Sequence, residues 1–314
     1  MRPGRKNKKV MYQRTLARPI SFTGIGLHLG SKVNVTIRPA DADNGIVFVR
    51  TDLPDHVEIK ADVENVVDTK FATTLGHNGA KISTVEHLLA AFLGLGIDNA
   101  IIEIDSSEVP IMDGSASPFV YLLRTAGIKV QNRFKRFLVI KKPIKVSDGD
   151  KKVILAPLKG LKITYTVEFD HHLISRQSCA MEFSNGVFER EICRARTFGF
   201  LKEIEVLRAN GFAKGGSLDN SIVLGDFRVL NEDGLRFPDE FVRHKILDSI
   251  GDLSLLGVPV IGHLIAYKSG HALNHKLIKK VVSNRKSWRL VKAADEVAET
   301  CQVPSFGLLG EVPA

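Results

Sequence analysis

Two segments far apart in the chain each place a histidine at the start of an apolar stretch typical of a buried helix. Glu86-His87 precedes the apolar run 88–95, and Arg243-His244 precedes the run 246–256. Polar groups at the mouth of a buried helix need partners, because an unpaired buried polar group is costly. A fold that packs two similar α+β halves face to face would let each helix deliver a histidine to one shared cleft.

The residues around these histidines have the composition of a catalytic metal site. His244 and Asp248 are four residues apart, so on a helix they share one face. With His87 they make two imidazoles and one carboxylate, a set that leaves zinc a fourth position for water. A His-x-x-x-Asp pair also arises by chance, and either residue can cap a helix or lie in solvent.

A zinc-activated water needs a proton acceptor and a proton donor nearby. Glu86 lies beside a ligand and fits the acceptor, although a carboxylate in the first turn of a helix is also favoured by the helix dipole. His271 is expected on a loop just past a strand, where it could donate a proton or simply be solvated. Asp252, two turns after His244, could keep His271 charged. Lys245 could meet an anionic substrate or lie in solvent.

Hydrophobic periodicity predicts an α+β chain with a domain boundary near residue 130. Residues 1–11 form a basic extension, 12–130 and 131–290 two α+β domains, and 291–314 a C-terminal tail. Strands are expected over Lys32–Ile37, Gly45–Val49, Ala100–Ile104, Phe137–Ile140, Lys152–Leu155, Leu161–Val167 and Gly262–Tyr267. Helices are expected over Ser83–Phe92, Pro118–Ala126, Glu203–Asn210 and Glu240–Leu256.

Composition excludes several classes of protein. No apolar run of the 314 residues approaches the ~20 needed to span a membrane. The three cysteines are odd in number and lack a Cys-x-x-Cys pair, which argues against a disulfide framework and fits a reducing cytosol. The net charge of +9 suggests an anionic partner, but no zinc-finger or RRM-like pattern accompanies it, so nucleic acid is not expected.

Beyond these patterns, an ordered set of motifs resembles the UDP-3-O-acyl-N-acetylglucosamine deacetylase family, the zinc amidases at the committed step of lipid A synthesis in Gram-negative bacteria. Each motif is modest alone, but the ordered set, from about residue 11 to about 280, is specific. The motifs are Gln13-Arg14-Thr15-Leu16, Gly24-Ile25-Gly26-Leu27-His28, Ile82-Ser83-Thr84-Val85-Glu86-His87-Leu88, Ile111-Met112-Asp113-Gly114-Ser115, Arg194-Ala195-Arg196-Thr197-Phe198-Gly199-Phe200, Leu230-Asn231-Glu232-Asp233-Gly234-Leu235-Arg236-Phe237, Phe241-Val242-Arg243-His244-Lys245 and Ala266-Tyr267-Lys268-Ser269-Gly270-His271-Ala272-Leu273-Asn274.

The resemblance implies two similar domains, each a mainly antiparallel sheet with two helices, packed face to face around the active site. It assigns one Zn²⁺, with Fe²⁺ as the alternative, to His87, His244 and Asp248. It implies a cytoplasmic enzyme that acts on UDP-3-O-acyl-N-acetylglucosamine, and a monomer is the default. The implied catalytic residues are Glu86 as general base, His271 as general acid, Asp252 as its partner and Thr197 as an oxyanion donor.

The resemblance also implies a binding surface for the rest of the substrate. An insert around residues 204–223 would form a hydrophobic passage for the acyl chain, although Lys214 is a polar intrusion there. The implied substrate-binding residues are Lys245, Phe198, Leu27, Ile204, Phe212, Gly216, Ser217 and Val223.

Three other functions remain open at this point. Another metal-dependent amidase could share the machinery and act on a different sugar. A basic RNA-binding module would show salt-dependent RNA affinity without metal. An inactive regulatory protein could retain a vestigial metal site.

Overall fold

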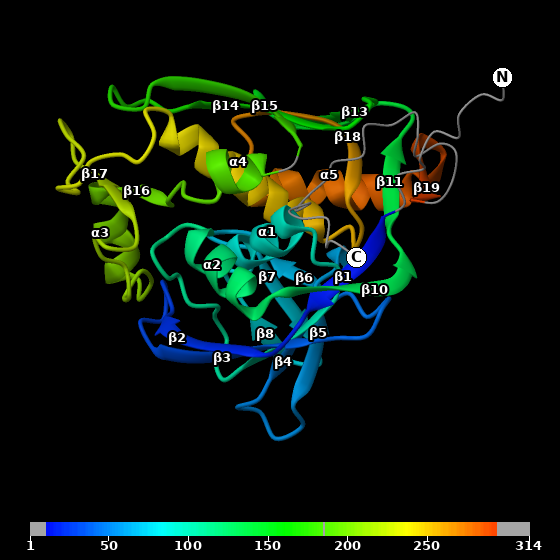
Figure 1. Ribbon diagram of the computed structural model, residues 1–314. Coiled ribbons are helices and arrows are strands. Elements are labelled where there is room, and N and C mark those ends of the chain that lie inside the picture. The colour runs from blue at the N-terminus through cyan, green and yellow to red at the C-terminus, as the bar shows by residue number, and fades with distance from the viewer. Residues whose placement is uncertain (1–10, 185, 294–314) are drawn as a thin grey trace.

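The computed structural model describes residues 11–184 and 186–293 and shows a mixed α+β fold with mostly antiparallel sheets (Figure 1). The expected fold class is thereby confirmed in its coarse form. The helices, including short 3₁₀ and π turns, are η1 (Val63–Asn65), α1 (Glu86–Leu95), α2 (Ser117–Ala126), η2 (Phe188–Ile192), α3 (Leu201–Ala209), α4 (Glu240–Ser254), α5 (His271–Ser283) and η3 (Arg285–Ser287).

The earlier part of the chain builds a five-stranded sheet in the order β2-β3-β9-β4-β5, in which β4 and β9 are parallel and the other pairs antiparallel. In β3 the residues alternate between buried and more exposed, so one face of the sheet lies on the core. The strands of this part are β1 (Tyr12–Leu16), β2 (Ile20–Ile25), β3 (Lys32–Pro39), β4 (Ile46–Arg50), β5 (Val57–Lys60), β6 (Val66–Asp68), β7 (Thr74–His77), β8 (Ala80–Ile82) and β9 (Ala100–Ile104).

The later part builds a seven-stranded sheet around β18, which pairs with β13, β11 and β14. Two further pairs lie outside the large sheets: β1 with β10, and β16 with β17. The strands of this part are β10 (Ile128–Phe134), β11 (Arg136–Ile140), β12 (Ile144–Asp148), β13 (Lys151–Ala156), β14 (Leu161–Glu168), β15 (Arg176–Phe183), β16 (Phe198–Phe200), β17 (Ile222–Leu224), β18 (Val260–Tyr267) and β19 (Trp288–Lys292).

The helices α1 and α4 pack against each other between the two large sheets (Figure 1). Their contact is so close that a Cβ atom at Gly251 would overlap the carbonyl group of Glu86. Glycine at this point of α4 therefore allows the two helix backbones to approach. Each helix is followed by a strand in the interior of one sheet, β9 after α1 and β18 after α4, as the two similar sequence segments indicated.

Two local expectations are wrong. The first helix begins at Glu86 rather than Ser83, because Thr84 has a left-handed backbone with φ of 58° and cannot continue a helix; it ends at Leu95, where Gly96 takes the left-handed cap. His271 lies on no loop but is the first residue of α5. The periodicity of residues 271–283 is that of an amphipathic helix, which the sequence interpretation overlooked.

None of the helices among the described residues is long and apolar enough to cross a membrane, in agreement with the hydropathy of the sequence.

Candidate metal centre and active site

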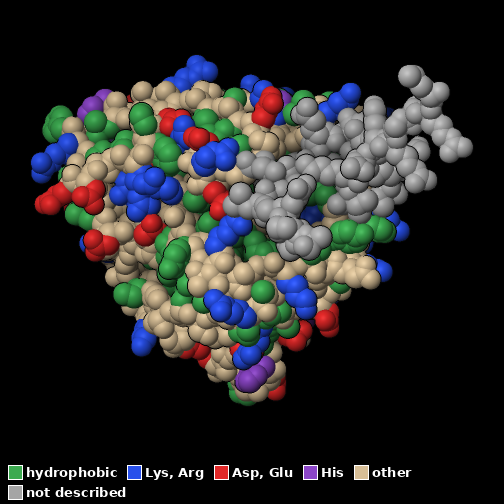
Figure 2. Space-filling model, viewed as in Figure 1, with side chains coloured by type: hydrophobic (Ala, Val, Ile, Leu, Met, Phe, Trp, Pro, Cys, Tyr) green, Lys and Arg blue, Asp and Glu red, His purple; other side chains and the backbone are tan. Residues whose placement is uncertain are grey.

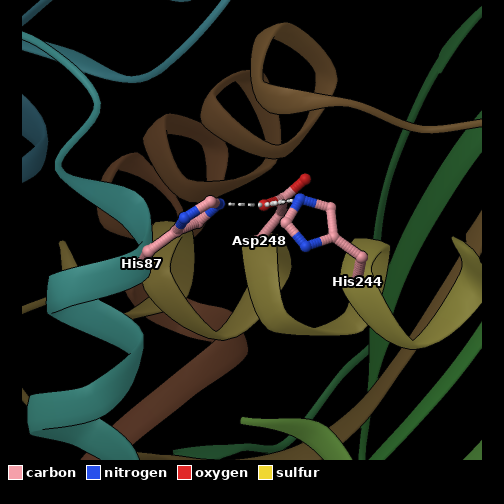
Figure 3. A group of neighbouring side chains, drawn as sticks. All are labelled: His87, His244 and Asp248. Carbon is pink, nitrogen blue, oxygen red and sulfur yellow. Dashed lines mark ion pairs between the residues drawn. The ribbon is translucent and has the colours of Figure 1, made fainter. Parts of the chain in front are cut away.

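The two histidine-bearing helices bring three candidate ligands together in the interior. His87 extends from α1, while His244 and Asp248 extend from successive turns of α4, and the three side chains point toward one another (Figure 3). One ligand atom from each lies within 4.8 Å of the others, and all three residues are buried. The oxygen Oδ1 of Asp248 lies 3.5 Å from Nε2 of His87 and 3.3 Å from Nε2 of His244.

The hydrogen bonding of this trio fits a bound cation. Oδ1 of Asp248 is buried and accepts no hydrogen bond, although it faces both imidazole rings. Nδ1 of His244 lies 3.1 Å from the carbonyl oxygen of Ala195, so the Nδ1–H tautomer leaves the Nε2 lone pair directed at the cluster. Burial lowers the pKa of His244 to about 3, which keeps the ring neutral, as a metal ligand must be.

A buried ion pair fixes the segment that carries Ala195. The guanidinium Nε of Arg196 donates to Glu240 at 2.9 Å, and the backbone N–H of Arg196 donates to the same carboxylate oxygen at 3.0 Å. Glu240 is the first residue of α4 and is completely buried. Arg196 thereby holds its segment against the start of the helix that carries His244.

A second group of titratable residues adjoins the three ligands. Nε2 of His271 lies 3.7 Å from Oε1 of Glu86 and 3.8 Å from Oδ2 of Asp248. On its other side, Nδ1 of His271 lies 3.0 Å from Oδ2 of Asp252. One edge of the imidazole therefore faces the three candidate ligands, and the other edge is held by the buried carboxylate of Asp252.

The environment raises the pKa values of Glu86 and His271. Burial raises the pKa of Glu86, and the positive charges of His271 and His87 oppose that shift. Burial works against a charged His271, but the carboxylates of Asp252 and Glu86 outweigh it and raise the pKa of His271 to about 10. The site therefore contains an imidazole that holds its proton more strongly than usual, close to a Glu86 carboxyl group of increased basicity.

Two residues that the sequence interpretation did not select complete this group. The hydroxyl group of Thr73 donates to Oδ1 of Asp252 at 2.7 Å, and its backbone N–H donates to Oε2 of Glu86 at 3.0 Å. The amide group of Asn274 donates to Oδ2 of Asp252 at 2.8 Å. Asn274 lies inside one of the motifs quoted above, whereas no spacing or composition marks Thr73.

The chain matches the family model for UDP-3-O-acyl N-acetylglycosamine deacetylase over residues 13–283. It is 53% identical over 310 residues to the UDP-3-O-acyl-N-acetylglucosamine deacetylase of Myxococcus xanthus, an alignment that covers 99% of this chain and 97% of the relative. The chain belongs to the UDP-3-O-acyl-N-acetylglucosamine deacetylase family.

Other members of this deacetylase family are similarly close. The proteins of the same name from Syntrophus aciditrophicus and Pasteurella multocida are each 53% identical, over 277 and 289 residues. These alignments cover 88% and 91% of this chain, and 88% and 95% of the respective relatives. The resemblance inferred from the motifs is thereby confirmed over nearly the whole chain.

Residues that the deacetylase resemblance assigns to the sugar and nucleotide lie on the His244 side of the cluster. The Nζ of Lys245 is 2.8 Å from Oδ2 of Asp248 and 5.8 Å from the centre of the Phe198 ring. Phe198 packs edge-on against His244, with 6.2 Å between the ring centres. Lys245 is therefore neither isolated nor simply solvated, because it neutralises the second oxygen of the candidate ligand.

Thr197 is held by its backbone on both sides. Its N–H donates to the carbonyl oxygen of Gly114 at 2.8 Å, and its carbonyl oxygen accepts from the N–H of Ile222 at 2.8 Å. It is half-buried and lies two residues beyond Ala195, the hydrogen-bond partner of His244. Among the described residues, the Thr197 hydroxyl group makes no hydrogen bond to the three candidate ligands.

The residues expected to form an acyl passage lie at and around α3. A groove of about 730 Å³ runs along this helix, and it is lined by Lys70, Phe71, Lys202, Glu203, Val206, Leu207, Asn210 and Phe212. Of the expected residues, Phe212 lines this groove, and its ring centre lies 5.1 Å from that of Phe71. Ile204 is half-buried and lies on the same helix.

The remaining expected residues lie beyond the groove. The backbone N–H of Gly215 donates to the carbonyl oxygen of Leu27 at 3.0 Å, which joins the 213–217 turn to the turn after β2. Gly216 is half-buried and Ser217 is exposed in that turn, whereas Val223 is buried in β17. Gly216 lies beside the Leu27 side chain, and none of Leu27, Gly216, Ser217 and Val223 lines the groove itself.

The surface charge does not form a continuous basic patch on the visible face of the protein. Figure 2 shows Lys and Arg side chains distributed among Asp and Glu side chains over the described part of this face. This pattern provides no support for a nucleic-acid interface there.

Proposed function

We propose that the protein removes the acetyl group from the 2-acetamido group of UDP-3-O-acyl-N-acetylglucosamine, in the committed step of lipid A synthesis. The observation that carries this proposal is the arrangement at the α1–α4 contact. Three buried candidate ligands converge, and the cluster adjoins a carboxylate of increased basicity and a protonated histidine. Family membership supplies the substrate that suits this machinery.

We infer that the cation is Zn²⁺, with Fe²⁺ as the alternative, held by His87, His244 and Asp248. Two neutral imidazoles and one carboxylate are a set typical of catalytic zinc. When bound there, the cation would polarise the acetamide carbonyl group and increase the acidity of a water molecule.

We assign the proton transfers to the two flanking residues. Glu86 accepts a proton from the attacking water, because its carboxylate is buried and held by the N–H of Thr73. His271 donates a proton from Nε2 to the departing nitrogen, while Asp252 holds Nδ1. Water is thereby added across the amide bond, and acetate and a free amine are released. Thr197 supplies a hydroxyl group to the oxyanion.

We assign the rest of the substrate to two neighbouring regions. Lys245 and Phe198, beside the cluster, contact the sugar–nucleotide portion. The acyl chain lies along the groove at α3, where Val206, Leu207 and Phe212 offer apolar surface. Leu27, Ile204, Gly216, Ser217 and Val223 are assigned to the support or continuation of this passage.

We also propose that the protein is a monomer of two domains, residues 12–130 and 131–290, whose helices meet at the active site. The layers of Figure 1 support this division, because the five-stranded sheet is built from the first part and the seven-stranded sheet from the second, except that β19 extends to Lys292. A cytoplasmic location is consistent with Cys179 and Cys193, which are both free thiols.

Acetate release from two matched substrates tests this function. With the zinc-loaded protein we expect release from UDP-3-O-acyl-N-acetylglucosamine and at least a tenfold lower kcat/KM for UDP-N-acetylglucosamine, which lacks the acyl chain. Equal activity on both substrates would favour an amidase of different specificity. Activity on neither would overturn the proposal.

A further inference from the structure

The backbone N–H, the carbonyl oxygen and the hydroxyl group of Thr73 each form a hydrogen bond to a residue at or beside the candidate active site. Its N–H donates to Glu86, its carbonyl oxygen accepts from the N–H of Val85 at 3.4 Å, and its hydroxyl group donates to Asp252. The residue is 2% exposed and immediately precedes β7. A single buried residue therefore connects the start of α1 with a carboxylate on α4.

The hydroxyl group also lies beside the imidazole of His271. The distance from Oγ1 of Thr73 to Nδ1 of His271 is 3.2 Å, and both atoms lie against the carboxylate of Asp252. Because the Thr73 hydroxyl donates its proton to Asp252, its oxygen can accept from Nδ1–H of His271. This arrangement keeps a proton on Nδ1 and directs Nε2 toward the cluster.

We propose that Thr73 is a positioning residue that sets the distance and orientation between the general base Glu86 and the Asp252–His271 pair. Its main chain fixes the base, and its side chain fixes the partner of the acid. This inference rests on the proposed function, since it assigns Thr73 to the two proton transfers described above.

The backbone and the side chain of Thr73 act on different residues, and a substitution can separate the two. Loss of the hydroxyl group leaves the N–H donor to Glu86 in place, but it removes the donor to Asp252 and the neighbouring acceptor for Nδ1 of His271. Asn274 still donates to the other oxygen of Asp252, so this carboxylate keeps a partner when Thr73 is changed. The effect of losing the hydroxyl group should therefore appear in the orientation of His271 rather than in metal binding.

The variant Thr73→Val removes the hydroxyl group at nearly constant volume, and Thr73→Ser retains it. We expect Thr73→Val to lower kcat about 10- to 100-fold, the range typical for loss of an outer hydrogen bond at a metal site, with KM within about threefold. The zinc content should stay unchanged, because the side chain of Thr73 bonds to none of the three candidate ligands. Thr73→Ser should restore kcat to within about fivefold of the wild type. The matched control is Thr15→Val, because Thr15 is also buried and its hydroxyl group accepts from Ala40 away from the site.

A merely structural role predicts a different result. Thr73→Val and Thr15→Val would then lower the melting temperature and kcat alike, and Thr73→Ser would bring no recovery of kcat. In an Asp252→Ala background, the account predicts that Thr73→Val lowers kcat clearly less than in the wild type, because only its contact with His271 remains to be lost. A full additional loss in that background would overturn the proposal.

The ring nitrogen signals of His271 give a readout that does not require turnover. In a nitrogen-15 NMR spectrum of the zinc-loaded protein we expect Nδ1 of His271 to be protonated and hydrogen-bonded in the wild type and in Thr73→Ser. The Nδ1 signal should shift in Thr73→Val. An unchanged His271 signal in Thr73→Val would contradict the proposal, even if the wild type released no acetate and the proposed function itself had failed. Should Thr73→Val not fold, the smaller Thr73→Ala variant tests the same prediction.

Discussion

Two regions of the molecule differ sharply in burial. One is the contact between α1 and α4, and the other is the helix α3. Nearly every residue of α1 and most residues of α4 are buried, whereas no residue of α3 is buried. The buried pair carries the candidate ligands and the proton-transfer groups, which need fixed positions. The exposed helix lines a groove, where binding of a flexible chain tolerates adjustment. Changes at the first region should therefore affect kcat and metal content, and changes at the second should affect KM.

The largest effect is expected from loss of a candidate ligand. His244→Ala removes an imidazole from the cluster and leaves Asp248 with one fewer partner. We expect loss of the bound metal and of detectable acetate release, measured by metal analysis and a product assay on the same sample. Retention of one equivalent of metal at wild-type affinity would show that His244 is not a ligand.

A smaller but still large effect is expected from loss of the general base. Glu86→Ala should lower kcat by about 10²–10⁴-fold, because positioned proton transfer typically contributes that much. The metal content should stay near one equivalent, in contrast to His244→Ala. Full activity of this variant would remove Glu86 from the proposed role.

The pH dependence of kcat/KM separates the two proton-transfer groups. Glu86 must be ionised to accept a proton, so activity should fall as the pH drops through its pKa, which burial raises above that of an ordinary carboxylate. His271 must be protonated to donate, so activity should fall as the pH rises through about 10. A profile that is flat up to pH 11 would exclude His271 as the general acid.

The smallest effect is expected at the exposed groove. Val206 is 61% exposed and lines the groove, so Val206→Asp should raise KM for the acylated substrate about three- to tenfold, with kcat and the melting temperature nearly unchanged. Val130→Asp is the matched control, because Val130 is 58% exposed on β10 and does not line the groove. Equal KM values for both variants would argue against an acyl-chain site at α3.

The sequence predicted those parts of the molecule whose signal is local or periodic. The apolar runs after His87 and His244 correctly indicated two buried helices, and the i, i+4 spacing of His244 and Asp248 correctly indicated a shared face. Thr73 was not predicted, because its hydrogen bond to Asp252 joins residues 179 positions apart, and such a contact leaves no pattern in either segment.

The two errors in the expected helix bounds also have structural causes. The positive φ of Thr84 is imposed by tertiary contacts, since Ser83 next to it bonds to the segment around Ser107. The helical start at His271 was missed because the preceding residues, Ser269 and Gly270, are typical of a loop. The first backbone hydrogen bonds of α5 run from the N–H groups of Leu273 and Asn274 to the carbonyl oxygen of Gly270 itself.

Titration of the metal-stripped protein with zinc tests the central claim most directly, with acetate release from UDP-3-O-acyl-N-acetylglucosamine as the readout. The account predicts no activity without metal, a linear increase up to one equivalent of zinc, and no such recovery in His244→Ala. Wild-type activity in the metal-free protein, or full recovery in His244→Ala, would contradict the account of a single metal held between α1 and α4.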